Sequence, residues 1–234
     1  MSDIPEELPT SPDTPAALAA TVRMAVRPLT PGMRGFDTVA TLTAENGRAF
    51  RQGGYEFVCR YLDSLTLGEI AGILSAGLGL MGVRYARADG WAPTGAEGAA
   101  DGASTVNKAR ALGMPKGWGI ACDLEGCAIG TSQADVTAYL DAWGAAVTGA
   151  GYVAVLYVGT KCVLTGVQLG ALRYFTHYWR SCSWVPEVSV GYCMLQSRGA
   201  ENVVIFGVKV DVDQVEHDLH SPPRTPPAVF QAAA

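Results

Sequence analysis

The sequence predicts an α/β protein with the fold of a compact, partly degenerate (β/α)8 TIM barrel. Roughly eight short segments rich in apolar, aromatic and β-branched residues recur along the chain, and the early ones are each followed by a helical segment or a gap of that length. Several of these segments are almost unbroken apolar runs, which is typical of parallel strands covered by helices on both faces. Acidic residues fall at the ends of three of them.

The expected elements follow in chain order. The expected strands are 33–39, 56–62, 78–86, 118–124, 152–159, 174–180, 192–197 and 203–212, and the expected helices are 41–53, 66–77, 95–112, 132–150 and a weaker 163–172. Thr41, Thr66 and Ser132 are expected to cap helix starts, and Thr66 and Glu69 have the spacing of a capping box. Gly77 is placed to end the second helix. The later units have loops where helices are expected.

A doubly wound open sheet is the structural alternative. That fold is typically associated with a glycine-rich phosphate loop after its first strand, and the run GFDTVA at 35–40 is not one. We therefore favour the barrel.

Composition excludes several classes of protein. The chain has 234 residues, of which 49% are apolar and 17% charged, so it can bury a large core and is not intrinsically disordered. The net charge of -5, with no cluster of Lys or Arg, argues against a nucleic-acid partner. No apolar stretch is long enough for a membrane span, and the acidic, proline-rich start does not resemble a signal peptide. We expect a soluble protein without a membrane partner.

The chain is expected to divide into three parts. Residues 1–31 form a flexible N-terminal arm, residues 32–219 the barrel, and residues 220–234 a proline-rich C-terminal tail. Either arm is a possible contact for protein assembly partners.

The six cysteines contain no C-x-x-C pair, so we expect reduced, buried thiols rather than a disulfide framework. A zinc site is the alternative, since Cys122 and Cys127 lie five residues apart. The three histidines have no ligand spacing relative to them. We expect no metal and no cofactor.

Five carboxylates are the main functional signal. Asp37 ends the first expected strand, Asp123 and Glu125 the fourth, and Asp211 and Asp213 the eighth. Active sites of such barrels lie at the carboxyl ends of the strands, and residues two apart on a strand face the same side. We therefore expect all five acids to converge on one small cavity.

Like charges in such a cavity cannot all ionise, so one carboxyl is expected to keep its proton near neutral pH. A protonated and an ionised carboxyl group together suit glycoside hydrolysis. Two alternatives remain open: the acids cap helices and loop amides, or they bind a divalent metal.

Other strand residues are expected to bind the sugar, because aromatic rings stack on sugar rings and amides bind hydroxyl groups. They are Tyr61, Tyr85, Tyr157, Trp179 and Gln196. Core packing is the alternative role for the aromatic residues. Arg60 and Arg84 also lie in strands, and one of them is expected to pair with the acids. Arg60 is also expected to bind the substrate.

Four runs of sequence resemble one family. They are GFDTVATLT (35–43), GGYEFVCRYL (53–62), LTLGEIAGILSAGLGLMGVRY (65–85) and GAADGASTVNKARALGMPKGWGIACDLEG (98–126). These runs resemble the glycoside-hydrolase-like domains classed as domain of unknown function 1906, over roughly residues 34–215. Those domains are similar in turn to family-25 glycoside hydrolases, barrel-fold lysozymes that cut the glycan of peptidoglycan.

The resemblance implies a role for each acid. Asp37 matches the first-strand aspartate of the lysozymes. Asp123 and Glu125 match their D-x-E pair, in which Glu is the proposed general acid. Asp211 matches the aspartate of their V-D-x-N motif, and Asp213 stands where they carry Asn, so either could face the substrate. The lysozymes are proposed to use the N-acetyl group of the substrate as nucleophile, which makes Asp123 the steering residue here.

The expected function is therefore a retaining, muramidase-like hydrolase of peptidoglycan, associated with a phage or prophage. Such a chain stays in the cytoplasm until lysis or travels with a virion. The alternative is a weak or inactive barrel that binds glycan or serves as a structural module of a phage tail or injection assembly. A metal-dependent esterase or deacetylase is a third possibility, for which only His177 is placed.

Overall fold

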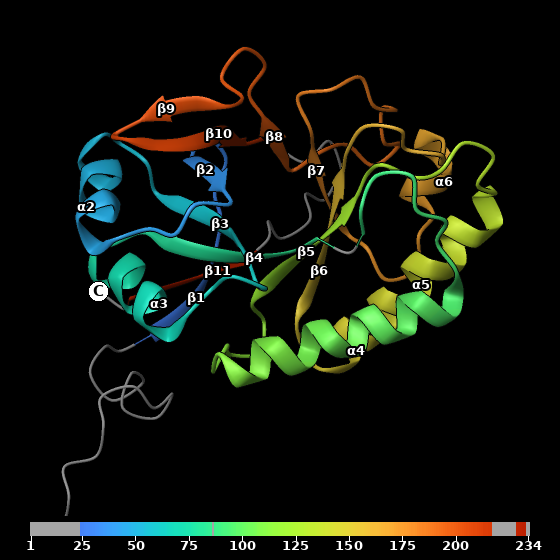
Figure 1. Ribbon diagram of the computed structural model, residues 1–234, viewed down its shortest axis with the longest axis horizontal. Helices are drawn as coiled ribbons and strands as arrows, with labels where there is room; N and C mark the ends of the chain where they lie inside the picture. The colour runs from blue at the N-terminus through green and yellow to red at the C-terminus, as the bar shows by residue number, and fades with distance from the viewer. Residues whose placement is uncertain (1–23, 86, 217–227, 233–234) are drawn as a thin grey trace, which may run out of the picture.

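The computed structural model describes residues 24–85, 87–216 and 228–232. At its centre is a closed eight-stranded barrel with helices packed outside it, as predicted (Figure 1). The barrel strands are β2 (Arg34–Thr38), β3 (Phe57–Tyr61), β4 (Gly79–Tyr85), β5 (Gly119–Leu124), β6 (Val153–Val158), β7 (His177–Arg180), β8 (Met194–Gln196) and β10 (Val208–Val215).

The barrel is mixed rather than wholly parallel. From β2 to β8, each strand pairs in parallel with the next one along the chain. The last strand, β10, closes the ring by pairing antiparallel with both β2 and β8. We call the end where the parallel strands finish the mouth.

The expected single strand 203–212 is wrong, because the chain forms a hairpin there. Strand β9 (Val203–Ile205) pairs antiparallel with β10 across a two-residue turn. Phe206 and Gly207 in this turn have φ of 47° and 77°, the left-handed values that tight hairpins need at both central positions. The turn reverses the chain, which is why the closing strand runs against its neighbours.

The helices lie near their expected positions: α2 (Ala44–Gln52), α3 (Leu67–Ser75), α4 (Gly95–Ala111), α5 (Gln133–Gly149) and α6 (Gly166–Gly170). The caps at Thr66 and Ser132 are confirmed, since each side chain accepts a backbone N–H three residues later. Gly77 follows α3 with φ of 82°, as a helix-ending glycine does. Helix α2 begins later than expected, because Thr43 rather than Thr41 forms its capping box.

Alternate strand residues build two apolar layers, which explains the unbroken apolar runs. Inward-facing side chains fill the barrel, among them Phe57, Cys59, Met81, Val83, Ala121 and Val155. Outward-facing ones pack under the helices, among them Phe36, Val58, Leu80, Ile120 and Leu156. Helices α4 and α5 lie against each other beside the barrel (Figure 1). A Cβ at Gly98 of α4 would lie 2.1 Å from the carbonyl oxygen of Tyr139, so glycine permits this close approach.

Parts of the expected arms belong to the fold. Strand β1 (Met24–Pro28) pairs antiparallel with β11 (Ala228–Ala232), and β11 lies beside β4. Leu29 and Val229 are buried in the inner apolar layer, at the end of the barrel opposite the mouth. The assignment of residues 24–31 to a flexible arm is therefore corrected. Residues 1–23, 217–227 and 233–234 lie outside the described part of the chain.

All six cysteines are free thiols. Cys59, Cys122, Cys127 and Cys193 are buried, as expected, whereas Cys162 and Cys182 are half-buried. Among the described residues, no helix combines the length and the apolar character needed to cross a membrane. In the same part of the chain, no three His, Cys, Asp or Glu side chains are placed to hold a metal ion together.

Candidate active site

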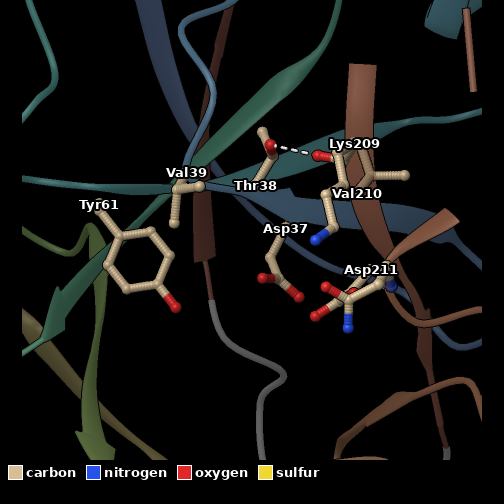
Figure 2. A pocket seen from close by; sticks show the side chains of 8 residues that line it. Asp37, Thr38, Val39, Tyr61, Lys209, Val210 and Asp211 are labelled. Carbon is tan, nitrogen blue, oxygen red and sulfur yellow. Dashed lines mark hydrogen bonds between the residues drawn. The ribbon is translucent and has the colours of Figure 1, made fainter. Parts of the chain in front are cut away.

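Asp37 and Asp211 meet at the mouth of the barrel. Asp37 lies next to the end of β2, and the β2–β10 register places Asp211 directly opposite it. The side-chain amide nitrogen of Gln196 donates to Oδ2 of both carboxyl groups, at 3.0 Å each. Figure 2 shows the two carboxyl groups facing the same space as the hydroxyl group of Tyr61.

Gln196 fixes the geometry of this pair. Its side-chain oxygen accepts the hydroxyl proton of Tyr157 at 3.2 Å and the backbone N–H of Cys182 at 3.1 Å. Because the oxygen is engaged by two donors, the NH2 group must point toward the acids. The structure thus brings the predicted residues Gln196 and Tyr157 to the acids, where they organise the carboxyl pair.

Asp123 and Glu125 lie across the mouth, at the end of β5. Asp123 is 4% exposed, and its Oδ1 has no hydrogen-bond partner in the described structure. Glu125 is half-buried and passes over Gly159, where an added Cβ would lie 2.7 Å from Glu125 Oε2. The indole nitrogen of Trp91 donates to the backbone oxygen of Glu125 at 2.8 Å. The backbone around the acid is therefore anchored while its carboxyl group stays accessible.

Burial and mutual repulsion favour protonated carboxyl groups here. Burial is the main cause that raises the pKa of Asp37 to about 7. Repulsion from Asp211 and Glu125 contributes to this rise in pKa, whereas the hydrogen bond from Gln196 opposes it. Burial also raises the pKa of Asp123 well above its usual range, and Glu125 and Asp37 add to it. The pKa of Glu125 is raised by burial and by Asp89. The repulsion of Asp37 by Glu125, and of Asp123 by Asp37, acts across the mouth.

Asp213 lies deeper than Asp211, inside the barrel. Because β10 runs antiparallel, Asp211 is level with Asp37, whereas Asp213 is opposite Gly35, further from the mouth. Asp213 is fully buried, its Oδ1 accepts from the Trp179 indole at 3.0 Å, and its Oδ2 has no partner in the described structure. Burial raises its pKa well above the usual range, and Asp37 adds to this. Asp211 is the one of the two that faces the open site.

A pocket of about 150 Å³ opens beside the carboxyl pair (Figure 2). It is lined by Asp37, Thr38, Val39, Tyr61, Asn202, Lys209, Val210 and Asp211. Asn202 and Lys209 come from the β9–β10 hairpin and were missed by sequence reasoning, which treated that segment as one strand. The turn-forming Gly207 was the signal for it.

The other predicted binding residues have different surroundings. Tyr61 lines the pocket. Trp179 is 1% exposed and donates to Asp213, so it has no ring face for a sugar. Tyr85 ends β4 opposite Asp123 in the strand register, and its side chain lies outside what the structure describes.

Arg60 does not reach the acids. It is fully buried on the outer face of β3, where its guanidinium donates to Glu69 of α3 at 2.7 and 3.2 Å and to the Thr38 carbonyl at 2.6 Å. Neighbouring strand residues face opposite sides, so Arg60 points away from the barrel that Cys59 fills. The expectation that Arg60 binds substrate is corrected. Glu69 likewise serves this ion pair rather than a capping box.

Sequence reasoning also missed the surroundings of Glu125. Lys161 donates to both carboxylate oxygens of Asp89, at 2.8 and 2.7 Å. Asp89 lies against Gly126, the residue after Glu125. No motif in the sequence marks this pair, because its members come from loops after β4 and β6.

Comparison with known protein families gives one match. The model of the family described as "Rv2525c-like, glycoside hydrolase-like domain" matches residues 48–217. That range includes four of the five acids and leaves out Asp37. No curated protein matches this sequence.

Three solved structures share the fold. An uncharacterized protein of B. stearothermophilus has a TM-score of 0.60 at 19% identity, covering 79% of this chain and 96% of that one. The bacterial lysozyme of Streptomyces coelicolor has a TM-score of 0.54 at 14% identity, covering 82% and 95%. A family 25 glycosyl hydrolase of Bacillus anthracis has a TM-score of 0.50 at 12% identity, covering 81% and 91%.

Proposed function

This chain belongs to the Rv2525c-like, glycoside hydrolase-like domain family, and from that premise we propose that it hydrolyses the glycan of bacterial peptidoglycan. The observation that carries the proposal is the convergence of Asp37, Asp123, Glu125 and Asp211 at one barrel mouth, where burial raises carboxyl pKa values. A cavity that holds protonated carboxyl groups near neutral pH supplies the acid that glycosidic bond cleavage needs. The lysozyme fold of the S. coelicolor protein supports the choice of substrate.

Glu125 is the general acid in this proposal. It is more exposed than Asp123, and its raised pKa keeps a proton available. That proton passes to the glycosidic oxygen as the bond from this oxygen to the anomeric carbon breaks. The acetamido oxygen of the sugar that carries this anomeric carbon then bonds to it and forms an oxazolinium ion. Asp123, two residues before Glu125 at the end of β5, steers this group by accepting the acetamido N–H.

Water completes the reaction in a second step. The Glu125 carboxylate takes a proton from water as the water oxygen attacks the anomeric carbon, and the bond to the acetamido oxygen breaks. Two displacements at the same carbon retain its configuration. Asp37 and Asp211, tied together by Gln196, line the pocket on the opposite side and bind sugar hydroxyl groups.

The test is digestion of purified peptidoglycan, followed by measurement of new reducing ends. Wild type is expected to release them, and Glu125→Gln is expected to lose about 100-fold or more, the usual contribution of a general acid. Glu45→Gln, the same change on the exposed first turn of α2, is the matched control and keeps full activity. Unchanged activity of folded Glu125→Gln would overturn the proposal.

Glycan binding without cleavage is the second candidate function. It is favoured by the lining of the pocket beside the carboxyl pair. Asn202 and Lys209 can bind sugar hydroxyl groups there, and Glu125 is not among the lining residues. Retention of glycan by wild type and Glu125→Gln alike, with no reducing ends from either, would establish it.

The phage or prophage setting expected from the sequence stays a prediction. Finding the chain in fixed stoichiometry in purified virions would support an assembly role. Release of the chain only at host lysis would support the role of a lysin.

A further inference from the structure

One tryptophan stands in solvent near the mouth. Trp184, on the loop between β7 and β8, is 90% exposed. The other four tryptophans are buried or half-buried: Trp91, Trp118, Trp143 and Trp179. An indole ring carries a large apolar surface, so one left in water on a loop at an active-site rim marks a ligand contact.

The loop that carries Trp184 is anchored to the carboxyl pair. The backbone N–H of Cys182 donates to the side-chain oxygen of Gln196, which itself holds Asp37 and Asp211. Ser183 N–H donates to the hydroxyl oxygen of Ser181 and tightens the turn. Two residues of extended chain span at most about 7 Å, so the backbone of Trp184 stays close to Cys182 and to the Gln196 side chain that holds the acids.

A second loop meets this one. The guanidinium of Arg198, just after β8, lies 6.0 Å from the centre of the Trp184 ring, within range of a cation–π contact. Arg198 also lines a cavity of about 250 Å³, whose other lining residues are Arg180, Ser181, Leu195, Gln196, Ser197, Gln214 and Glu216. Among the described residues, no carboxylate lies within 4.0 Å of Arg198, so its N–H groups remain available to a ligand.

We propose that Trp184 and Arg198 form a second sugar-binding subsite, which holds the glycan unit next to the one at the acids. The apolar C–H face of a β-linked pyranose ring stacks on the indole, and Arg198 donates to its hydroxyl or carboxylate oxygens. This inference rests on the proposed function and names the part of the mouth that selects a chain of sugars over a single one. Trp184 touches no reacting atom and is a binding residue.

Binding can be measured apart from cleavage in the Glu125→Gln background. The probe is a soluble oligosaccharide of alternating N-acetylglucosamine and N-acetylmuramic acid, titrated by calorimetry and by tryptophan fluorescence. The parent protein is expected to bind with a blue shift of emission, because the exposed indole leaves water. Trp184→Ala is expected to weaken affinity about tenfold, and Trp184→Phe, which keeps a ring, by less. The fluorescence change disappears in both.

Val167→Ala, at an exposed apolar position on α6, is the control and leaves affinity unchanged. With Glu125 intact, Trp184→Ala should raise KM for long glycans and leave kcat unchanged, as loss of uniform binding does. Unchanged affinity of Trp184→Ala, or no binding by the parent, overturns the subsite. Failure of the proposed function has a different signature, because it shows in the reducing-end assay, as undiminished cleavage by Glu125→Gln or as no cleavage by wild type.

Discussion

Burial, together with few hydrogen-bond partners, raises the pKa of Asp123 and of Asp213. Asp213 has one donor, the Trp179 indole, and Asp123 has an oxygen with none in the described structure. A buried carboxylate so poorly solvated is expected to take up a proton. The acids themselves could be predicted from sequence, because alternation along a strand places residues two apart on one face. Their depth could not, since it depends on the direction of β10.

Replacing Asp37 is expected to change how stability depends on pH. Its folded pKa is raised from 3.8 to about 7, so its favourable contribution is present below about pH 4 and is lost as pH rises toward 7. The free energy of unfolding of wild type relative to Asp37→Asn should therefore fall over this range, by on the order of 4 kcal/mol. Denaturant titrations at pH 4 and pH 8 measure it, and a pH-independent difference would contradict the assignment.

Asp213→Asn is expected to fold normally and to keep activity. The amide oxygen can still accept from Trp179, and a neutral side chain replaces a group whose pKa burial has raised. Asp213→Leu, which leaves the indole N–H unpaired, should cost about 1–3 kcal/mol of stability. Thermal unfolding and the reducing-end assay compare the two variants. A large loss of activity in Asp213→Asn alone would show that Asp213 works as an anion.

A buried ion pair holds α3 to the barrel. Glu69 accepts from Arg60 of β3 and from the backbone N–H of Leu42, so one carboxylate joins a helix, a strand and a loop. The sequence predicted the strand of Arg60 and the helix of Glu69 correctly, but it placed Arg60 among the acids at the mouth. Glu69 was not recognised as its partner, because its spacing from Thr66 suggested a capping box. A charged residue inside an apolar strand has to find its partner in three dimensions, which spacing alone does not reveal.

Breaking this pair is expected to be costly. Arg60→Met leaves Glu69 buried and uncompensated, and should lower the free energy of unfolding by about 3–5 kcal/mol. Glu187→Gln, which breaks the pair of Arg180 with the largely exposed Glu187, is the control and should cost at most about 1 kcal/mol. Urea denaturation measures both. Equal losses would mean that burial does not distinguish the two pairs.

The whole molecule is a barrel closed at the end opposite the mouth by β1 and β11. The sequence did not predict this, since both strands lie in proline-rich segments that read as linkers. Their pairing is non-local, and only the buried positions of Leu29 and Val229 show that they complete the inner layer. Because β1 and β11 cover one end of the barrel, the mouth is the end that stays open to a substrate.

Val229 tests this closure. Val229→Asp places a charge in the inner apolar layer against Gly79 and should lower stability by about 3 kcal/mol or more. Val204→Asp, at an exposed position of β9, should stay within about 0.5 kcal/mol of wild type. Equal melting temperatures for the two variants would contradict a structural role for β11.

In the proposed reaction, Glu125 at the barrel mouth is the acid that cleaves the glycan. The most direct measurement is the pH profile of reducing-end release from peptidoglycan by wild type and Glu125→Gln. Because burial raises the pKa of Glu125, wild-type activity should persist above the usual pKa of 4.5 and fall only as Glu125 loses its proton. The variant should show a rate about 100-fold lower and lack that descending limb. Superimposable profiles would show that Glu125 is not the acid.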